Sequence, residues 1–360
     1  METISFSPLT GAPGDQTLSS PAHTAATVKR KRNILSGMRP TGKLHLGHLV
    51  GALENWVALQ DEFQNYHLIA DYHALTTNLD SSDIDRNSFE MVIDWLAAGI
   101  DPEKSPLFRQ SQIKQHTELH LLFSMLITAA RLERNPAVKD QVRDLQIENV
   151  SYGHLGYPVL QAADILLYKG EMIPVGEDQV PHVEISREIA RRFNTQYGRV
   201  FPEPEAKLTT FARLPGLNGI DRKMSKSSGN AVLLSDSPEQ IHQRIKSAVT
   251  DPEKVRKNDP GRPEVCLVYT YHKKFNKAEA GEIGNDCRSG ALGCVDCKRR
   301  VASKISESLA PIRDRRNRFE ANPDEVMSIL ADGERRARSR AEETMSEVRS
   351  AMNLGIIREG

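Results

Sequence analysis

Two histidines near the start of the chain have the spacing and surroundings of a phosphate-binding site. His45 and His48 are three positions apart, so they share one face if the segment is helical. They lie in the segment 40–48, where Gly47 lets a nucleotide approach the backbone closely. Imidazoles on one face can donate hydrogen bonds to phosphate oxygens. The alternative is a pair of surface histidines in a glycine-rich loop.

A second segment, Lys223-Met224-Ser225-Lys226-Ser227, places two lysines three positions apart in a loop rich in glycine and polar residues. Each lysine is a compact charge on a flexible stem, which suits a pyrophosphate leaving group whose charge grows during reaction. Lysines and serines are commonplace in surface loops, so this segment alone indicates little. Together with the histidine segment it indicates chemistry on a nucleotide.

A third set combines a phenol, an amide and a carboxylate. Tyr157, Gln161 and Asp164 fall at positions i, i+4 and i+7, and Pro158 suits the first turn of a helix. One helix face therefore directs these groups toward a common pocket. The alternative for Asp164 is an acid on a helix surface, which the apolar residues that follow it disfavour.

All four cysteines lie within 32 residues, in the spacing C-x20-C-x6-C-x2-C, as Cys266, Cys287, Cys294 and Cys297. A group of this kind is typical of a metal or iron–sulfur site in a reducing compartment. Zinc sites usually have two C-x2-4-C pairs, and only Cys294 and Cys297 form one, which favours an iron–sulfur cluster. The alternatives are zinc or four inert buried thiols.

A basic run follows the cysteines. Residues 298–318 hold eight basic residues against Glu307 and Asp314, a local net charge of +6 in a chain whose 48 basic and 48 acidic residues balance. The eight are Lys298, Arg299, Arg300, Lys304, Arg313, Arg315, Arg316 and Arg318. The run predicts contacts with a nucleic-acid backbone, and the alternative is a solvated helix face.

The composition sets the class of protein that must hold these groups. A chain of 360 residues with 39% hydrophobic and 27% charged residues is typical of a globular protein of about two domains. The most apolar stretch, 119–132, is too short to cross a membrane, and four cysteines do not make a disulfide scaffold. Membrane, collagen-like and small secreted classes are excluded.

Strands alternate with helices in the first two thirds of the sequence. The patterns predict strands at 34–36, 66–70, 107–110 and 171–175, and helices from about Leu46, at 84–98 and at 117–132. This alternation predicts an open, parallel α/β sheet, in which nucleotides bind at the carboxyl ends of the strands. The segment 40–48 follows the first strand and so lies at that edge.

The remaining sequence divides into two other regions. From about residue 237 strand signals vanish and apolar residues recur at helical spacing, which predicts a helical domain over 237–360. Residues 1–32 contain nine Ser or Thr in their first 28 positions and close on four basic residues. They predict a disordered extension ahead of a catalytic domain over 33–236, with an organelle transit peptide as the alternative.

The histidine and lysine segments together resemble the HLGH and KMSKS signatures of class I aminoacyl-tRNA synthetases. Within that class, from residue 33 onward, the chain resembles the bacterial-type tryptophanyl-tRNA synthetases. The further segments that carry this likeness are Ser36-Gly37-Met38-Arg39-Pro40-Thr41-Gly42, Ala162-Ala163-Asp164-Ile165-Leu166-Leu167-Tyr168 and Val175-Gly176-Glu177-Asp178-Gln179. Departures are Leu35, where many members have an aromatic residue, and Gln161, where some have methionine.

The resemblance implies a Rossmann-like catalytic domain with a parallel sheet, a C-terminal all-α domain that binds the tRNA anticodon, and roles for single residues. Asp164 would accept the indole N–H, Tyr157 and Gln179 would hold the ammonium group, and Gln161 and His73 would line the tryptophan pocket. His45, His48, Lys223 and Lys226 would be catalytic. The ATP site would comprise Arg39, Pro40, Thr41, Gly47, His48, Gly176, Glu177, Asp178, Leu214, Lys223, Met224, Ser225, Lys226 and Ser227.

The resemblance also implies cofactors and partners. ATP with Mg²⁺, L-tryptophan and tRNA(Trp) are the expected substrates, and a cytoplasmic homodimer the expected form. The four cysteines resemble those of members with a [4Fe-4S] cluster. Three alternatives stay open: a tyrosyl-tRNA synthetase, a tryptophan-activating paralogue with a non-translational role, and a non-synthetase adenylyltransferase.

Overall fold

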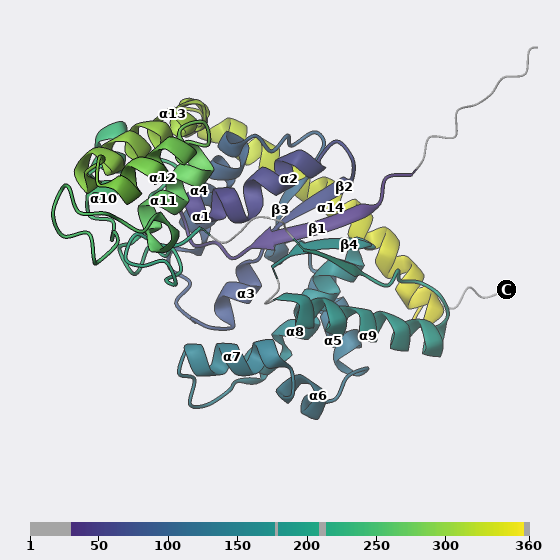
Figure 1. Ribbon diagram of the computed structural model, residues 1–360. Coiled ribbons are helices and arrows are strands. Elements are labelled where there is room, and N and C mark those ends of the chain that lie inside the picture. The colour runs from purple at the N-terminus through teal and green to yellow at the C-terminus, as the bar shows by residue number, and fades with distance from the viewer. Residues whose placement is uncertain (1–29, 177–178, 209–213, 356–360) are drawn as a thin grey trace, which may run out of the picture. The chain divides into compact units, whose positions relative to one another are not determined.

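The computed structural model describes residues 30–176, 179–208 and 214–355 (Figure 1). Most of the predicted extension over 1–32, together with Glu177 and Asp178, lies outside the described residues. Every element below belongs to the compact unit Lys31–Gly360.

Five parallel strands form one sheet in the order β3-β2-β1-β4-β5. They are β1 (Asn33–Met38), β2 (Gln64–Ile69), β3 (Leu107–Arg109), β4 (Met172–Val175) and β5 (Glu205–Leu208). The predicted parallel α/β sheet is confirmed. The sequence did not indicate β5, because this edge strand is half exposed and mixes polar with apolar residues.

Side chains alternate across this sheet and feed two hydrophobic layers. Ile69 and Leu107 belong to one cluster, whereas their neighbours Leu68 and Phe108 belong to the other. Helices therefore cover both faces, as Figure 1 shows. The first layer holds α1 (Leu46–His48), a π-helical turn (Leu49–Leu53), α2 (Glu54–Leu59), α4 (Ile84–Ala98), α10 (Pro238–Lys246), α11 (Leu267–Phe275) and α13 (Cys294–Glu320).

The second layer holds α5 (Gln115–Ser124), α8 (Tyr152–Leu167) and α9 (Val180–Tyr197). The long helix α14 (Pro323–Ala351) joins the two layers, because Val326 and Leu330 pack in the first and Met345 and Val348 in the second. It crosses the sheet edge at β3, where Gly333 lies so close to the backbone of Leu107 that a Cβ atom would collide with it. The shorter helices are α3 (Asp71–Leu75), α6 (Ala129–Glu133), α7 (Pro136–Asp144) and α12 (Ala280–Ser289).

Two predicted helices have different limits. The helix predicted over 117–132 is wrong in its middle, because α5 ends at Ser124 and α6 restarts after Thr128, whose side chain accepts a hydrogen bond from the backbone of Arg131. Helix α8 begins at Tyr152, capped by Ser151, so Pro158 lies inside the helix and not in its first turn. The helix predicted over 84–98 is confirmed, with Gly99 in the left-handed conformation at its end.

The described helices include none that is long and apolar enough to span a membrane. The predicted domain boundary at residue 237 stays a prediction. The first hydrophobic layer runs across it, since Trp95 and Leu96 of α4 and Ile305 and Leu309 of α13 share one cluster.

Candidate active site

The structure brings the histidine segment and the lysine segment together. The chain that follows the lysines pairs with the chain around the histidines, through hydrogen bonds from Leu46 N to Val232 O (2.9 Å) and from Leu234 N to Leu44 O (3.0 Å). His45 itself forms a bridge with Leu233. The two sequence motifs are therefore neighbours at the carboxyl end of β1, where an open sheet binds nucleotides.

His45 and His48 form a close pair. Their ring centroids are 3.8 Å apart, and the backbone N–H of His45 donates to Nδ1 of His48 (3.3 Å). Burial, with the neighbouring lysines adding to it, lowers the pKa of His45 to about 4. Burial and the facing His45 ring lower the pKa of His48 to about 3. Both imidazoles are neutral at pH 7, so each offers one N–H donor and no charge.

Gly47 sits against these rings. A Cβ atom at this position would lie 2.9 Å from Cε1 of His45, and the N–H of Gly47 points at the sulfur of Met224 (3.4 Å). Close packing on His45 and Met224 therefore explains the glycine in this structure, beside the nucleotide approach that the sequence suggested.

The lysine loop is fixed at its base by a buried asparagine. Asn230 Oδ1 accepts from the backbone N–H of Ser225 (2.7 Å), and its amide donates to Lys223 O (3.0 Å) and to Asn218 (2.7 Å). Met224 is buried, whereas the side chains of Lys223 and Ser227 are exposed. The loop thus has a fixed base, an exposed Lys223 and a half-buried Lys226.

Lys226 reaches the loop after β1. Its ammonium group donates to the backbone oxygen of Thr41, and burial lowers its pKa while Asp94 and Glu90 oppose that shift. Arg39 donates to Thr77 (3.2 Å). Pro40 and Leu214 are buried, and Gly176 is exposed.

Asp164 lies at the centre of a second, fully buried set of side chains. His73 Nε2 is 2.9 Å from Oδ2, while Gln110 Nε2 (2.7 Å) and His116 Nδ1 (2.6 Å) both contact Oδ1. A carboxylate can only accept, so all three groups donate to it. His116 also contacts the hydroxyl of Tyr168 (3.0 Å). We call these five residues the Asp164 cluster.

The cluster holds its carboxylate in the charged form. Burial works to raise the pKa of Asp164, but the hydrogen bonds from His116 and His73 outweigh burial and lower it. Among the described residues only His73 contacts Oδ2, and its side chain retains 9% exposure against 0% for His116, which contacts Oδ1.

Tyr157 stands beside the Asp164 cluster on the same helix, α8. Its ring centroid is 6.5 Å from that of His73, and its hydroxyl contacts Nε2 of His182 (3.0 Å). Gln161 and Gln179 are half buried, and Gln179 precedes the first turn of α9. The common pocket predicted for Tyr157, Gln161 and Asp164 stays a prediction.

Sequence reasoning missed three groups that build these sites. Gln110, His116 and Asn230 come from separate segments, and each holds a predicted site residue. For His116 the sequence did carry a signal, since it lies on the same apolar face of α5 as Leu119 and Phe123. A single histidine in an apolar helix stripe indicates a buried partner elsewhere.

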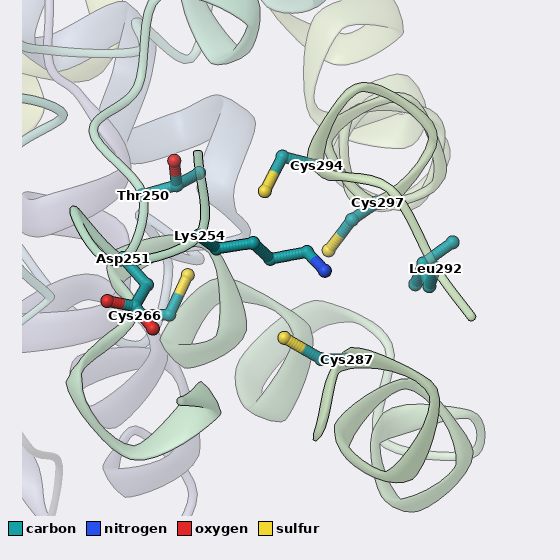
Figure 2. A pocket seen from close by; sticks show the side chains of 8 residues that line it. All are labelled: Thr250, Asp251, Lys254, Cys266, Cys287, Leu292, Cys294 and Cys297. Atoms are coloured by element: carbon teal, nitrogen blue, oxygen red, sulfur yellow. The ribbon is translucent and has the colours of Figure 1, made fainter. Parts of the chain in front are cut away.

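The four cysteines also meet, as the structure places them around one small cavity of about 20 Å³. Cys266 precedes α11, Cys287 lies in α12, and Cys294 and Cys297 lie in the first turn of α13. Figure 2 shows the side chain of Lys254 running between them. Within the described part of the chain, no three His, Cys, Asp or Glu side chains are arranged as a metal site.

The donor set nevertheless fits a thiolate-bound cation. Burial and the other three thiols raise the pKa of Cys297 to about 12, so this sulfur ionises near pH 7 only beside added positive charge. Gly261 forms a cradle here, because a Cβ at this residue would lie 2.6 Å from the sulfur of Cys287. Four convergent sulfurs are the ligands that zinc and iron–sulfur clusters use.

The basic run on α13 is only partly free to meet nucleic acid. Arg316 is fully buried and bonded to Asp94, so the prediction that it contacts a phosphate backbone is wrong. Arg315 donates to the backbone oxygen of Ala97 (2.6 Å). Charge runs on helices also serve packing between helices, which the sequence alone does not distinguish. Arg299 and Arg300 are exposed at the start of the helix.

The fold and the paired signature segments define a nucleotide-binding enzyme of the synthetase class. The family model described as tRNA synthetases class I (W and Y) matches residues 27–310. The chain belongs to this family, which removes the non-synthetase adenylyltransferase from consideration.

Two curated relatives are similar over nearly their whole length. A tryptophan–tRNA ligase of Thermotoga maritima is 50% identical, covering 89% of this chain and 99% of that protein. One of Aquifex aeolicus is 45% identical, with the same two shares. Among solved structures, tryptophanyl-tRNA synthetase from Campylobacter jejuni, complexed with ADP and tryptophan, has a TM-score of 0.80 at 33% identity. That match covers 89% of this chain and 99% of that chain.

Proposed function

We propose that this chain attaches L-tryptophan to tRNA(Trp) through a tryptophanyl-adenylate, using ATP with Mg²⁺. The observation that carries the proposal is the backbone pairing of the His45–His48 segment with the chain after Lys226. The similarity to tryptophan–tRNA ligases over 99% of their length supports tryptophan over tyrosine.

In the first step the tryptophan carboxylate attacks the α-phosphorus of ATP, and pyrophosphate leaves. Neutral His45 and His48 donate hydrogen bonds to the phosphates, while Lys223 and Lys226 compensate the negative charge that grows on pyrophosphate. A ribose hydroxyl of the tRNA terminus then attacks the carbonyl carbon of the adenylate, forming the ester while AMP leaves. The chain needs no covalent nucleophile, since positioning and electrostatics supply the rate.

The tryptophan side chain binds over the Asp164 cluster. Oδ2 accepts the indole N–H, and Gln110 and His116 keep Oδ1 in place from the far side. Tyr157 and Gln179 hold the ammonium group, and Gln161 and His73 line the pocket. A substrate without an N–H or O–H donor would leave Oδ2 with His73 as its one donor and would forgo the indole hydrogen bond, so phenylalanine binds less well than tryptophan.

The test is aminoacylation of total tRNA with the purified full chain, alongside amino-acid-dependent exchange of pyrophosphate into ATP. Tryptophan is expected to support both reactions and tyrosine neither. Exchange with tyrosine alone would establish the tyrosyl alternative. Exchange with tryptophan but no charging would instead establish the paralogue with a non-translational role.

We further propose that Cys266, Cys287, Cys294 and Cys297 hold a [4Fe-4S] cluster, with zinc as the alternative occupant. The convergence of four sulfurs on one cavity supports this. Lys254 crosses that cavity, so its side chain has to move aside for a cluster. The cluster would supply positive charge to the thiolates and fix α12 against α13.

Anaerobic purification followed by iron, sulfide and zinc analysis tests the cluster. Cys297→Ser is expected to lose iron and sulfide and to impair charging more than tryptophan activation. Val295→Ser is the matched control, because it places a hydroxyl in the same turn on a side chain that is 69% exposed. Stoichiometric zinc without sulfide would refute the cluster, and no metal at all would refute the site.

We propose that the exposed start of α13 contacts the tRNA backbone. Arg299→Ala with Arg300→Ala is expected to reduce the logarithmic salt dependence of tRNA binding by about 1 per residue, with tryptophan activation unchanged. Arg335→Ala on α14, also exposed, is the control. An unchanged salt dependence would contradict the assignment.

We propose a homodimer from two exposed apolar side chains, Leu121 on α5 and Met125 directly after it, at 57% and 69% exposure. Sedimentation of the wild-type chain is expected to give a dimer, and Met125→Asp a monomer. A wild-type monomer would refute the dimer. A cytoplasmic location stays a prediction.

A further inference from the structure

A buried carboxylate outside the predicted site accepts a hydrogen bond from the backbone next to the histidine segment. Asp94 lies on α4 with no exposure, among fully buried neighbours such as Ile93 and Trp95. Its Oδ2 accepts the backbone N–H of Leu44 at 2.6 Å. Leu44 directly precedes His45, so this carboxylate acts on the first turn of the histidine segment through one hydrogen bond.

The other oxygen of Asp94 is held by a second helix. Arg316 of α13 donates to Oδ1 at 2.5 Å, and its guanidinium also contacts Glu90 and Glu320. Arg316 is itself fully buried. The guanidinium therefore fixes the carboxylate in one orientation, with Oδ2 turned toward Leu44.

Both backbone polar groups of Leu44 form hydrogen bonds. Its N–H donates to Asp94, and its carbonyl oxygen accepts from the N–H of Leu234, in the segment that follows the lysine loop. Without Asp94 that N–H would be a buried donor with no acceptor, which is unfavourable. The two bonds together set where His45 and His48 stand relative to the chain that carries Lys226.

An ion pair this deeply buried is a poor source of stability. Removing two charges from water costs several kcal/mol per ion, and well-packed apolar replacements are often neutral or stabilising. Packing of α13 on α4 would thus be served as well by apolar side chains. The charges at these two positions call for a role that apolar side chains cannot fill.

We propose that Asp94 is a positioning residue for adenylate formation. It supplies the acceptor that fixes Leu44, with Arg316 as its buried ion-pair partner, so that the His45–His48 turn is in place before ATP binds. The inference rests on the proposed function only for its assay, the exchange of pyrophosphate into ATP. Neither residue touches substrate in this arrangement.

Two double variants separate positioning from packing. Asp94→Leu with Arg316→Met removes the ion pair and leaves Leu44 N–H without an acceptor. Asp94→Asn with Arg316→Met removes the same ion pair, but the amide oxygen still accepts from Leu44. Both double variants lose the charges of Asp94 and Arg316. They differ in whether residue 94 can accept a hydrogen bond from the N–H of Leu44.

The asparagine pair is expected to keep kcat within about threefold of the wild-type chain. The leucine pair is expected to lose about 10- to 100-fold in kcat, since misplacement by about 1 Å has effects of that order. The KM for tryptophan should stay within about twofold in both variants, because the Asp164 cluster is untouched. Equal kcat in the two variants would overturn the proposal.

A second variant keeps the test decisive if the leucine pair does not fold. Replacing Leu44 by its α-hydroxy acid removes the N–H and leaves both charged side chains intact. The same loss of kcat is expected, and an unchanged kcat would overturn the proposal. Glu118→Gln with Arg349→Met is the control, since it breaks an ion pair between α5 and α14 and is expected to leave kcat unchanged.

The wild-type measurement separates the two hypotheses. Absence of exchange with tryptophan in the wild-type chain would refute the proposed function. The ratio of kcat between the double variants tests the positioning role with whichever amino acid the wild-type chain activates.

Discussion

The Asp164 cluster and the lysine loop, two regions of one proposed active site, are built in opposite ways. In the cluster, Asp164 has three side-chain donors and only 2% exposure. In the loop, Lys223 and Ser227 project into solvent from a base that Asn230 fixes. Lys226 contacts only a backbone oxygen, that of Thr41, among its described hydrogen bonds.

This difference matches two different tasks. A carboxylate that is already oriented discriminates between amino acids at little cost in reorganisation, because its donors are fixed before the substrate arrives. Exposed lysines on flexible stems can instead follow charge as it moves onto a leaving group. Changes in the cluster should therefore act on tryptophan binding, and changes in the loop on rate.

Lys226→Ala should give the largest effect on the reaction. We expect kcat for tryptophan-dependent exchange to fall about 100- to 1000-fold, because removing one donor to a charge that develops in the transition state has effects of that order. The KM for tryptophan should hardly change. Lys246→Ala on α10, an exposed lysine, is the control. Equal losses in tryptophan binding and rate would contradict the division of tasks.

Asp164→Ala should weaken tryptophan binding and hardly affect ATP binding. Losing this buried acceptor is expected to cost about 1.5–3 kcal/mol in tryptophan binding, roughly 10- to 150-fold in affinity. It also leaves His73, Gln110 and His116 without their acceptor, so the melting temperature should fall. ATP binding, measured by calorimetry, should stay near the wild-type value. Unchanged affinity for tryptophan would show that Asp164 lies outside the pocket.

The same contrast explains how much of the molecule the sequence could predict. The parallel sheet follows from local apolar patterns and turn residues, and the loops after β1 and at 223–227 carry their chemistry in short segments. The partners of Asp164 cannot be found in this way, because His73 and the stretch that holds Gln110 and His116 lie far from Asp164 in the sequence, and only tertiary packing brings them together. Arg316 was misread for the same reason, since its burial depends on Asp94, which lies more than 200 positions away.

His67 is a second buried ionisable group, but unlike Asp164 it has no hydrogen-bond partner among the described residues. It lies in β2 with no exposure, stacked on Trp56 at 4.7 Å, and neither ring nitrogen has a hydrogen-bond partner among the described residues. Burial lowers its pKa to about 3, against about 6.5 in the unfolded chain. Above about pH 6.5 the ring is neutral in both the folded and the unfolded chain, so it does not affect the pH dependence of stability. As the pH falls from 6.5 toward 3, the unfolded chain binds a proton that the folded chain does not, and the free energy of unfolding decreases.

Replacing His67 by an apolar residue should make the stability of the fold depend less on pH. On going from pH 7 to pH 5, we expect His67→Leu to lose less stability than the wild-type chain, by about 2 kcal/mol. Urea denaturation at the two pH values measures the difference. His45 and His48 contribute equally to the pH dependence of stability in both proteins, so their contributions cancel in the comparison. Parallel pH responses would mean that His67 finds a partner in solution.

The smallest expected effect concerns the histidines of the proposed ATP site. With pKa values of about 4 for His45 and about 3 for His48, both rings are neutral throughout pH 6 to 8. Because kcat/KM reports the ionisation of the free enzyme, its value for ATP should show no inflection near pH 6.5 from these residues. If the histidines acted as imidazolium ions, kcat/KM would fall about tenfold per pH unit above their pKa. Magnesium in excess keeps the charge of ATP constant over this range, so a fall of that kind would refute neutral donors.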